Sequence, residues 1–376
     1  MPIAREKAQA LSAMEELDLT LFFPSAWREG SREYRLSEGE PEGGGYRIRT
    51  GRVLFSGRIG GHFYLTGLLR ALRETGPELV HLEEEPWSLV AAQVLLFRAL
   101  LRQRFKVVLF SWENLRLRLG SLRRLIERWV LSRVDVAIAG GEGARGRLIE
   151  QGFPAERVAV LPQLGLCPQR FSPLETPERG ERDFTIGYVG RLVPAKGVDL
   201  LVQAASQLGR GWRLVLIGDG PAREELVGLA ESLGVMNRLI FTGWVDHLEV
   251  PRHLRQFDVL VLPSRTTPDW MEQFGHVLIE AMACGVPVVG STSGAISEVI
   301  GDAGLVFPEG DSGALAQALK SLSDDESLWK RLAERGRKRV LEHYTWDRLA
   351  EKTLSIYRQC LGREPCPQKK KVEKNS

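Results

Sequence analysis

Short apolar segments rich in β-branched residues alternate along the chain with segments in which apolar residues recur every three or four positions. The first pattern is typical of buried strands and the second of amphipathic helices. In the first half, we expect strands at 19–23, 53–55, 79–82, 106–110, 135–139 and 158–161. In the second half, we expect strands at 184–189, 213–217, 239–241, 259–262, 287–289 and 304–307, with helices at 198–208, 222–233 and 276–284.

This alternation predicts an α/β fold. Strands that alternate with helices form parallel sheets, whose right-handed crossovers cover both faces. Because the rhythm occurs twice, we expect two doubly wound, Rossmann-like domains. The boundary falls at 162–182, a segment with several prolines and no clear apolar period. In such folds ligands bind beyond the carboxyl ends of the strands, so a shared site is expected in the cleft between the domains.

Composition adds the broad class of protein. The chain has 376 residues, of which 43% are hydrophobic and 26% are charged, values that exclude general disorder. No apolar run reaches the roughly 18–20 residues of a membrane span, and 1–10 lacks the apolar core of a signal peptide. The four cysteines are scattered, which argues against a zinc site or a disulfide framework. We therefore expect a cytoplasmic protein.

Charge is unevenly distributed. The net charge is +3, and the tail from 363 to 376 carries that excess, whereas 98–133 holds ten Lys/Arg against two Glu. Helical spacing there predicts one apolar face and an opposite basic face. The apolar face consists of Leu122, Leu125, Ile126, Trp129 and Val130. The basic face consists of Arg123, Arg124 and Arg128. Such a face docks on anionic lipid or a phosphorylated substrate, or is simply solvated. No nucleic-acid motif accompanies it.

The segment 190–197, GRLVPAKG, lies between a predicted strand and a predicted helix. It begins with Gly190 and brings Arg191 and Lys196 within five positions of each other. Arginine offers a fixed fork for phosphate oxygens, and lysine offers a mobile point charge. The segment therefore favours an anion-binding loop, the alternative being two surface cations.

A second candidate segment runs from Glu272 into the helix predicted at 276–284. Gly275 keeps the N-terminus of that helix open, so its free backbone N–H groups can bind a phosphate. Glu280 lies within the helix, eight residues after Glu272. Carboxylates are bidentate acceptors suited to the vicinal hydroxyls of a ribose or a hexose.

Two further segments follow predicted strands. In 243–246, backbone polar groups can bond the edge of a flat heterocycle while Val245 packs on it. In 218–223, the sequence begins Gly-x-Gly but has Arg223 where a dinucleotide fingerprint requires glycine. We interpret the latter as a plain turn and expect no NAD site.

Together these segments resemble the family 4 retaining glycosyltransferases of the GT-B fold. The resemblance is close from 184 to about 361 and loose in the first half. It is carried by Gly190-Arg191 with Lys196-Gly197, by 218–221, by the Glu272/Glu280 pair with Phe274-Gly275, by 281–289 and by Glu298. It implies two domains that face each other across a cleft, a nucleotide-diphospho-sugar donor held by the second domain, and a C-terminal helix that crosses back to the first.

The resemblance also implies roles for individual residues. Arg191 and Lys196 bind the donor diphosphate, Glu272 takes hexose hydroxyls, Glu280 binds the ribose and Val245 flanks the base. The donor-binding set is Gly190, Val245, Phe274, Gly275, His276, Val277 and Glu280, and the catalytic set is Arg191, Lys196 and Glu272. Because two cations and a helix terminus stabilise the leaving diphosphate, we expect no metal and no cofactor. The donor is a UDP-, GDP- or ADP-sugar.

The first half departs from the family pattern. The chain opens with 1–7, which reads like the loop and helix that follow a first strand. Either that strand is missing, which a start of the protein further upstream would explain, or another segment fills its place. After the strand at 106–110, many relatives place a histidine where Ser-Trp-Glu-Asn stands here. Glu113 either helps to position the acceptor or caps a helix. The acceptor-side candidates are His62, Tyr64, Glu83, Glu84, Glu85, Trp112 and Glu113.

The leading hypothesis is retaining hexosyl transfer to a cell-envelope lipid, lipid-linked saccharide or polysaccharide precursor, at the inner face of the membrane. The alternatives are transfer to a soluble acceptor and an inactive protein that binds a nucleotide sugar. We predict an acceptor-side domain at 1–165, a linker at 166–182, a donor domain at 183–345, a crossover helix at 346–362 and a disordered basic tail at 363–376.

Overall fold

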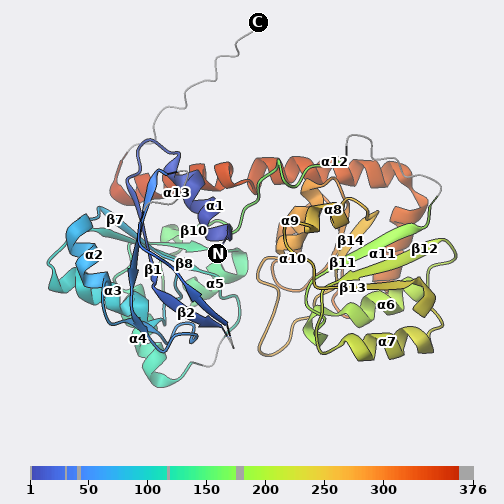
Figure 1. Cartoon of the computed structure of the whole chain (residues 1–376), viewed down its shortest axis with the longest axis horizontal. Helices are drawn as coiled ribbons and strands as arrows, with labels where there is room; N and C mark the ends of the chain where they lie inside the picture. The colour runs from blue at the N-terminus through green and yellow to red at the C-terminus, as the bar shows by residue number, and fades with distance from the viewer. Residues whose placement is uncertain (1, 30–31, 40–43, 117–118, 175–181, 364–376) are drawn as a thin grey trace, which may run out of the picture.

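The computed structural model describes residues 2–29, 32–39, 44–116, 119–174 and 182–363. Two lobes lie side by side, and red helices run along both of them (Figure 1). The longer helices are α1 (Pro2–Ser12), α2 (Leu68–Thr75), α3 (Leu89–Leu100), α4 (Ser121–Leu131), α5 (Glu142–Glu150), α6 (Val198–Ser206), α7 (Arg223–Ser232), α9 (His276–Ala283), α11 (Ser312–Asp324), α12 (Glu326–His343) and α13 (Trp346–Leu361). Two shorter ones are α8 (Val250–Leu254) and α10 (Ile296–Ile300).

The second lobe contains a six-stranded parallel sheet. Its strands are β11 (Phe184–Val189), β12 (Trp212–Ile217), β13 (Leu239–Gly243), β14 (Val259–Leu262), β15 (Val288–Ser291) and β16 (Leu305–Phe307). Their order across the sheet is β13-β12-β11-β14-β15-β16. From the central strand β11, the chain adds β12 and β13 on one side; it then returns to the other side of β11 and adds β14, β15 and β16. The boundary between β11 and β14 is the topological switch point, where doubly wound sheets bind ligands.

The first lobe is built around a four-stranded parallel sheet with the order β10-β9-β8-β7. These strands are β7 (Leu79–Leu82), β8 (Lys106–Ser111), β9 (Val136–Ala139) and β10 (Val158–Val160). A separate parallel pair is formed by β1 (Leu19–Pro24) and β4 (Tyr46–Gly51). The two lobes together confirm the predicted α/β fold class.

Short antiparallel pairs complete the first lobe. They join β2 (Ala26–Glu29) to β3 (Arg32–Arg35) and β5 (Val53–Leu54) to β6 (Phe63–Tyr64). The prediction of a parallel strand at 53–55 is thus wrong, because only Val53 and Leu54 pair and their partner strand is antiparallel. Phe55, with a φ of 58°, leaves the extended conformation and ends the strand.

The last helix belongs structurally to the first lobe. Trp346, Leu349 and Tyr357 of α13 are buried in one cluster with Val108, Phe110, Ile138 and Leu161 from β8, β9 and the segment after β10. The helix also packs against α1, and the Trp346 indole donates to the Glu6 carboxylate at 2.7 Å. The first and the last helix of the described residues, α1 and α13, therefore lie on the same lobe (Figure 1).

The orientation expected for α4 is wrong in part. Arg123, Arg124 and Arg128 are exposed as predicted, but Leu122 and Leu125 are also exposed, at 71% and 64%. The inward face carries Val130 and an acid instead: Glu127 is 2% exposed and accepts a hydrogen bond from the buried Arg147 of α5 at 2.6 Å. This pairing between two helices cannot be recognised from the spacing of apolar residues.

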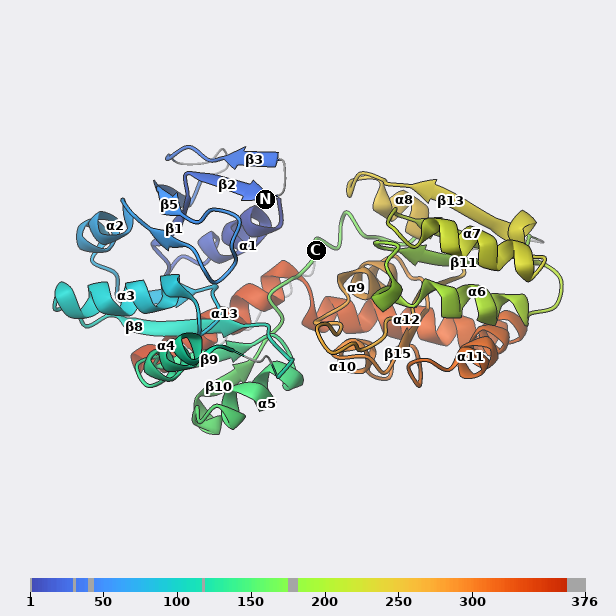
Figure 2. The same cartoon turned by 90° about the horizontal axis from the view of Figure 1, so that it is seen from below.

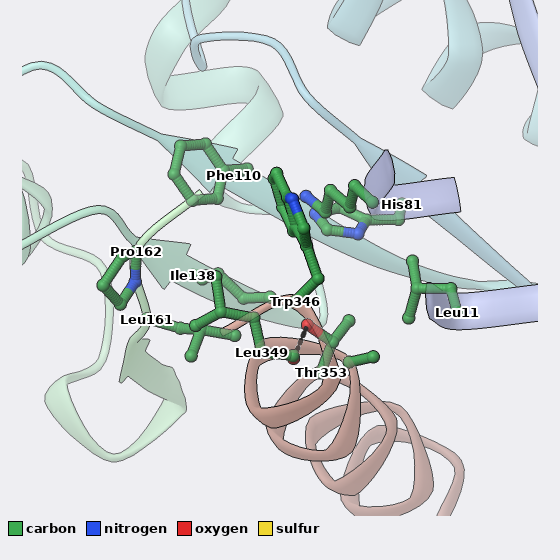
Figure 3. Close-up of a pocket in the computed structure, with 11 residues that line it drawn as sticks. Leu11, His81, Phe110, Ile138, Leu161, Pro162, Trp346, Leu349 and Thr353 are labelled. Atoms are coloured by element: carbon green, nitrogen blue, oxygen red, sulfur yellow. Dashed lines mark hydrogen bonds between the residues drawn. The ribbon is translucent and has the colours of Figure 1, made fainter. Parts of the chain in front are cut away.

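A pocket lies under the crossover helix, between α13 and the sheet of the first lobe (Figure 3). His81 from β7 lines it, and its Nδ1 lies 2.6 Å from the Tyr357 hydroxyl. Burial, reinforced by the charge of Lys7, lowers the pKa of His81 to about 4. The neutral ring therefore acts as a structural contact between β7 and α13.

Within the described residues, no helix combines the length and the apolar character that crossing a bilayer requires. The predicted disordered tail falls on 363–376, of which only Arg363 lies within the described residues.

Candidate functional site

Two loops meet at the switch point of the second lobe. The loop after β11 and the loop after β14 approach so closely that a Cβ on Gly197 would lie 2.0 Å from the Pro263 carbonyl oxygen. Gly197 also has a φ of 64°, a left-handed conformation that glycine adopts at little cost. The backbone N–H of Arg265 donates to the Ala195 carbonyl at 2.8 Å and fixes the contact. This close approach brings Lys196 to the residues that follow β14.

The Lys196 ammonium donates to the Glu272 carboxylate at 2.6 Å. The Ser264 hydroxyl donates to the same carboxylate oxygen at 2.9 Å, and the ammonium also lies 4.6 Å from the centre of the Trp270 ring. The lysine side chain is 21% exposed and the glutamate 10%. A half-buried cation and a buried acid are thus held in contact, and each has hydrogen-bonding capacity left for a ligand.

The backbone of Glu272 is held from both lobes. Its carbonyl accepts hydrogen bonds from the Ala295 N–H at 3.0 Å and from the Asn114 side-chain amide at 3.1 Å. A Cβ on Gly294 would lie 1.9 Å from that carbonyl oxygen, so only glycine permits the contact. Because Asn114 comes from the loop after β8, this hydrogen bond ties the first lobe directly to the predicted donor loop.

Arg191 lies at the same edge of the sheet, directly after β11 and Gly190. Its backbone carbonyl accepts a hydrogen bond from the Tyr188 hydroxyl at 2.8 Å. Its side chain is exposed, and among the described residues it makes no hydrogen bond or ion pair. The loop backbone is therefore fixed while the guanidinium remains available to solvent and ligand.

Helix α9 follows Glu272 and starts at the side of the second lobe nearest the first (Figure 2). Gly275 precedes it with a φ of 79°, and Phe274 is buried beside Trp112 of the first lobe, with ring centres 6.4 Å apart. Val245 and Val277 are both half-buried against the core around this helix. The predicted base-flanking residue thus packs against the same core as the predicted phosphate-binding helix.

Glu280 is buried within α9 and contacts two histidines. Its Oε1 lies 2.8 Å from His247 Nε2 and 3.0 Å from His276 Nδ1, and the two imidazole rings are stacked with centres 6.5 Å apart. Burial alone would raise the pKa of Glu280, but the charge on His276 and hydrogen bonds from both histidines outweigh it and lower that pKa to about 2. The carboxylate is therefore ionised, and one of its oxygens faces two imidazoles.

The predicted acceptor-side residues separate into two groups. His62 and Tyr64 are buried within the first lobe, where His62 Nε2 lies 3.5 Å from the Glu84 carboxylate and its ring packs on Trp27. Burial, opposed by a hydrogen bond from Ser88 and reinforced by the charge of Glu85, raises the pKa of Glu84 to about 7. Within the described part of the chain, neither His62 nor Tyr64 makes a hydrogen bond to the second lobe.

The second group of predicted acceptor-side residues stabilises the loop after β8; its members are Glu83, Glu85, Trp112 and Glu113. Glu85 accepts hydrogen bonds from the Ser111 hydroxyl at 2.7 Å and from the backbone N–H groups of Trp112 and Glu113 at 2.8 and 3.1 Å. The Glu113 carboxylate accepts from the Leu115 N–H at 2.8 Å, which caps a turn within its own loop.

Two more contacts fasten the loop to its surroundings. The Trp112 indole donates to the Gln163 side chain at 2.6 Å, and Glu83 pairs with Lys7 and with Gln163. These side chains, with the Glu85 carboxylate, shape the loop that carries Asn114 to the second lobe.

The structure thus brings together Lys196, Glu272 and the start of α9, whereas His62 and Tyr64 lie apart from them. The predicted site residues do not include three contributors: Asn114, Ser264 and His247. Ser264 follows the predicted strand 259–262 by two positions, so its place at a strand end was the available clue. His247 lies 33 residues before Glu280, and only the fold joins the two.

Two family descriptions match the chain. "Glycosyl transferases group 1" matches residues 174–339, and "Glycosyl transferase 4-like domain" matches residues 2–163. The first match contains the loop at 190–197, Glu272 and α9; the second contains the loop after β8.

Known relatives point in the same direction. A GDP-mannose-dependent alpha-(1-6)-phosphatidylinositol monomannoside mannosyltransferase of Mycobacterium tuberculosis is 34% identical over 252 residues, covering 62% of this chain and 65% of the relative. A 2-deoxystreptamine glucosyltransferase of Streptomyces kanamyceticus is 28% identical over 265 residues, covering 64% of each chain. The matched region thus spans slightly less than two thirds of either relative.

Solved structures share the fold. HepE of Anabaena, crystallised with UDP, superposes with a TM-score of 0.67 at 19% identity and covers 84% of this chain and 86% of its own. The sucrose-phosphate synthase of Thermosynechococcus elongatus gives a TM-score of 0.68 at 22% identity, covering 96% and 92%. At these identities the likeness establishes the two-lobed architecture.

Proposed function

Since this chain belongs to the group 1 glycosyl transferases, we propose that it transfers a hexosyl unit, with retention, from a nucleotide-diphospho-sugar to a cell-envelope lipid or saccharide. The observation that carries the proposal is the contact of Lys196 with Glu272 at the switch point, beside the open start of α9. This arrangement combines a cation for a diphosphate, an acid for sugar hydroxyls and a helix N-terminus for a further anion.

Each side chain has a proposed part in donor binding. Arg191, exposed and without a partner among the described residues, and Lys196 bind the diphosphate. Glu272 accepts hydrogen bonds from the hexose, and Glu280 accepts them from the ribose. Gly190, Phe274, Gly275, His276 and Val277 shape the site, and Val245 packs against the base. A nucleotide donor is supported by the mycobacterial relative, whose name gives GDP-mannose, and by HepE, crystallised with UDP.

In the proposed reaction, the bond between the anomeric carbon and the β-phosphate oxygen breaks, and its electron pair leaves with the nucleoside diphosphate. The acceptor hydroxyl oxygen bonds to the anomeric carbon from the same face, and its proton passes to the departing phosphate oxygen. The negative charge that develops on the diphosphate is stabilised by Arg191, by Lys196 and by the N–H groups at the start of α9. These groups supply the stabilisation without a metal.

A membrane-associated acceptor is supported by the outer surface of the first lobe. Helices α3 and α4 pack together and expose both apolar and basic side chains. We call this the α3–α4 surface; it consists of Leu96, Leu100, Leu122, Leu125, Arg123, Arg124 and Arg128. Exposed leucines beside arginines suit the interface of an anionic bilayer. The corresponding location is the cytoplasmic face of a membrane.

A soluble acceptor is the second candidate. The Streptomyces relative is named for transfer to 2-deoxystreptamine, a small molecule. An acceptor of this kind would not require the α3–α4 surface to touch lipid. Transfer to a vesicle-borne acceptor and transfer to a small soluble acceptor therefore distinguish the two candidates.

The donor is tested by thermal shift with UDP-, GDP- and ADP-sugars, followed by a transfer assay. A donor present at 100 times its dissociation constant adds about 2.7 kcal/mol to the folded state. We expect one nucleotide class to raise the unfolding temperature and to release free nucleotide when acceptor is added. Binding without release or transfer would contradict the proposed activity and favour an inactive nucleotide-sugar-binding protein.

The membrane part is tested with phosphatidylglycerol-containing vesicles at low salt. We expect the protein to cosediment with them and the R123E/R124E variant to remain in solution. The R331E/R335E variant carries the same charge change on exposed positions of α12 and serves as the matched control. Failure of the unmodified protein to bind anionic vesicles would contradict the membrane association alone.

A further inference from the structure

Two histidines and a glutamate, from two segments of the second lobe, bring their side chains close together. His247 lies in the segment after β13, whereas His276 and Glu280 occupy successive turns of α9. Their ligand atoms all lie within 4.8 Å of one another. We propose that His247, His276 and Glu280 bind a transition-metal ion, with zinc the best match to this ligand set. Two imidazoles with one carboxylate form a known three-ligand set for zinc that leaves a fourth position open.

The hydrogen bonding of His276 leaves one of its nitrogens suited to a cation. Its Nε2 lies 3.2 Å from the Gly165 carbonyl oxygen, which can only accept, so Nε2 carries a proton. Its Nδ1 faces Glu280 Oε1 at 3.0 Å, so this nitrogen points toward the spot that the three side chains share. A metal-binding histidine typically donates its other nitrogen to a carbonyl in this way.

Binding an ion requires the three ligand atoms to move to nearly equal spacings. A tetrahedral zinc ion with bonds of about 2.0–2.2 Å holds its ligand atoms about 3.3–3.6 Å apart. The two nitrogens now lie 2.8 and 3.0 Å from Oε1, so each must withdraw by roughly half an ångström. The two nitrogens, which lie within 4.8 Å of each other, must reach the same spacing. His247 is 45% exposed on its side chain and can move, whereas Glu280 is 5% exposed and fixed by α9.

The site has a consequence that rests on the proposed function. If Glu280 binds the ribose of the donor, then an ion held by the same carboxylate competes with the nucleotide. Zinc is thereby expected to inhibit transfer by weakening donor binding. The binding of zinc itself does not depend on any transferase activity.

The test is titration of the full-length protein with zinc against a chromophoric chelator, without nucleotide. We expect one zinc ion per chain with a dissociation constant in the micromolar range or below, and at least a tenfold loss of affinity in His247→Ala. His253→Ala removes a histidine from the adjacent helix α8 and should leave the affinity unchanged. Cobalt(II) gives a second readout, because a four-coordinate ion at this site absorbs strongly in the visible range.

The outcomes separate this site from the proposed activity. Millimolar or weaker zinc binding, or equal affinity in His247→Ala and the unmodified protein, would overturn the metal site and leave the transferase proposal intact. Zinc binding in a protein that binds no nucleotide sugar would support the site while contradicting the transferase. Zinc that binds at the triad and raises the apparent dissociation constant of the donor nucleotide would support both.

Discussion

The Lys196 ammonium and the Glu272 carboxylate, which we assign to different parts of one donor, lie 2.6 Å apart and bond to each other. The lysine follows β11 and the glutamate follows β14, so the switch point of the sheet creates this contact. When a diphosphate binds, the ammonium must share its hydrogen bonds between the phosphate and the acid. The two residues therefore form a coupled pair, and changing one alters the charge that the other presents.

Removing either proposed diphosphate cation should slow transfer strongly. For Arg191→Ala and Lys196→Ala we expect a loss on the order of 10²–10³ in kcat, by analogy with the loss of one oxyanion donor. Steady-state kinetics on the purified variants measures the effect. Lys320→Ala, at an exposed position of α11, is the matched control. Near-normal turnover in either variant would refute the role assigned to that residue.

Glu272→Gln should distinguish the sugar from the nucleotide. Because hydrogen bonds to a charged group contribute about 1.5–3 kcal/mol, we expect the nucleotide sugar to bind roughly ten- to 150-fold more weakly. The nucleoside diphosphate without its sugar should bind as well as before or better, since Lys196 loses its acidic partner. Calorimetric titration with both ligands measures the difference. An equal loss for both would place Glu272 away from the hexose.

Metal removal should not lower the transfer rate. The proposed stabilisation of the leaving diphosphate comes from Arg191, Lys196 and the start of α9, all of which belong to the chain. We expect dialysis against EDTA to leave kcat at its original value. A loss of activity that added magnesium or manganese restores would show that Arg191, Lys196 and the start of α9 do not suffice to stabilise the leaving diphosphate.

The buried Glu127–Arg147 pair predicts a large effect on stability. Both side chains are at most 3% exposed, and the guanidinium also lies 4.7 Å from the centre of the Trp87 ring. Arg147→Met leaves a buried carboxylate without its cation, which should cost about 3–5 kcal/mol. Adding Glu127→Leu should recover most of that loss, because the unpaired charge is removed as well. Denaturant unfolding of both variants measures their free energies of unfolding. A double variant no more stable than Arg147→Met would contradict the pairing argument.

Glu84 should make stability depend on pH. Its pKa rises from 4.5 when unfolded to about 7 when folded, so the folded state binds the extra proton between those values. The free energy of unfolding therefore falls as pH rises from about 5 to 8, on the order of 2–3 kcal/mol from this group. Glu84→Gln should remove that decline, as measured by urea unfolding at several pH values. Glu334→Gln, an exposed substitution, is the control, and an unchanged decline in Glu84→Gln would exclude Glu84 as its source.

The second lobe was predicted well from sequence because its strands are continuous apolar runs. The expected strand at 184–189 matches β11, and the expected helix at 276–284 matches α9 to within one residue. Local signals of this kind depend on neighbours in the chain, which a single sequence contains. The proximity of Lys196 to Glu272 was also within reach, since both follow predicted strands.

What sequence could not supply are contacts between distant segments. The inward position of Glu127 depends on Arg147, and the exposure of Leu122 follows from it. The grouping of His247 with His276 and Glu280 requires the segment after β13 to lie beside α9. Periodicity reports which side of an element is apolar, but it does not report which element packs against it.

The return of α13 to the first lobe has a consequence for how the protein is made. The apolar face formed by Phe110 and Ile138 is complete in sequence once β9 has been synthesised, yet its cover arrives only with Trp346 to Leu361. At about 5–20 residues per second, roughly 200 residues of elongation leave that face open for about 10–40 s. Nascent chains are thus expected to need a chaperone during this interval, and premature termination before α13 should yield aggregates rather than a free N-terminal lobe.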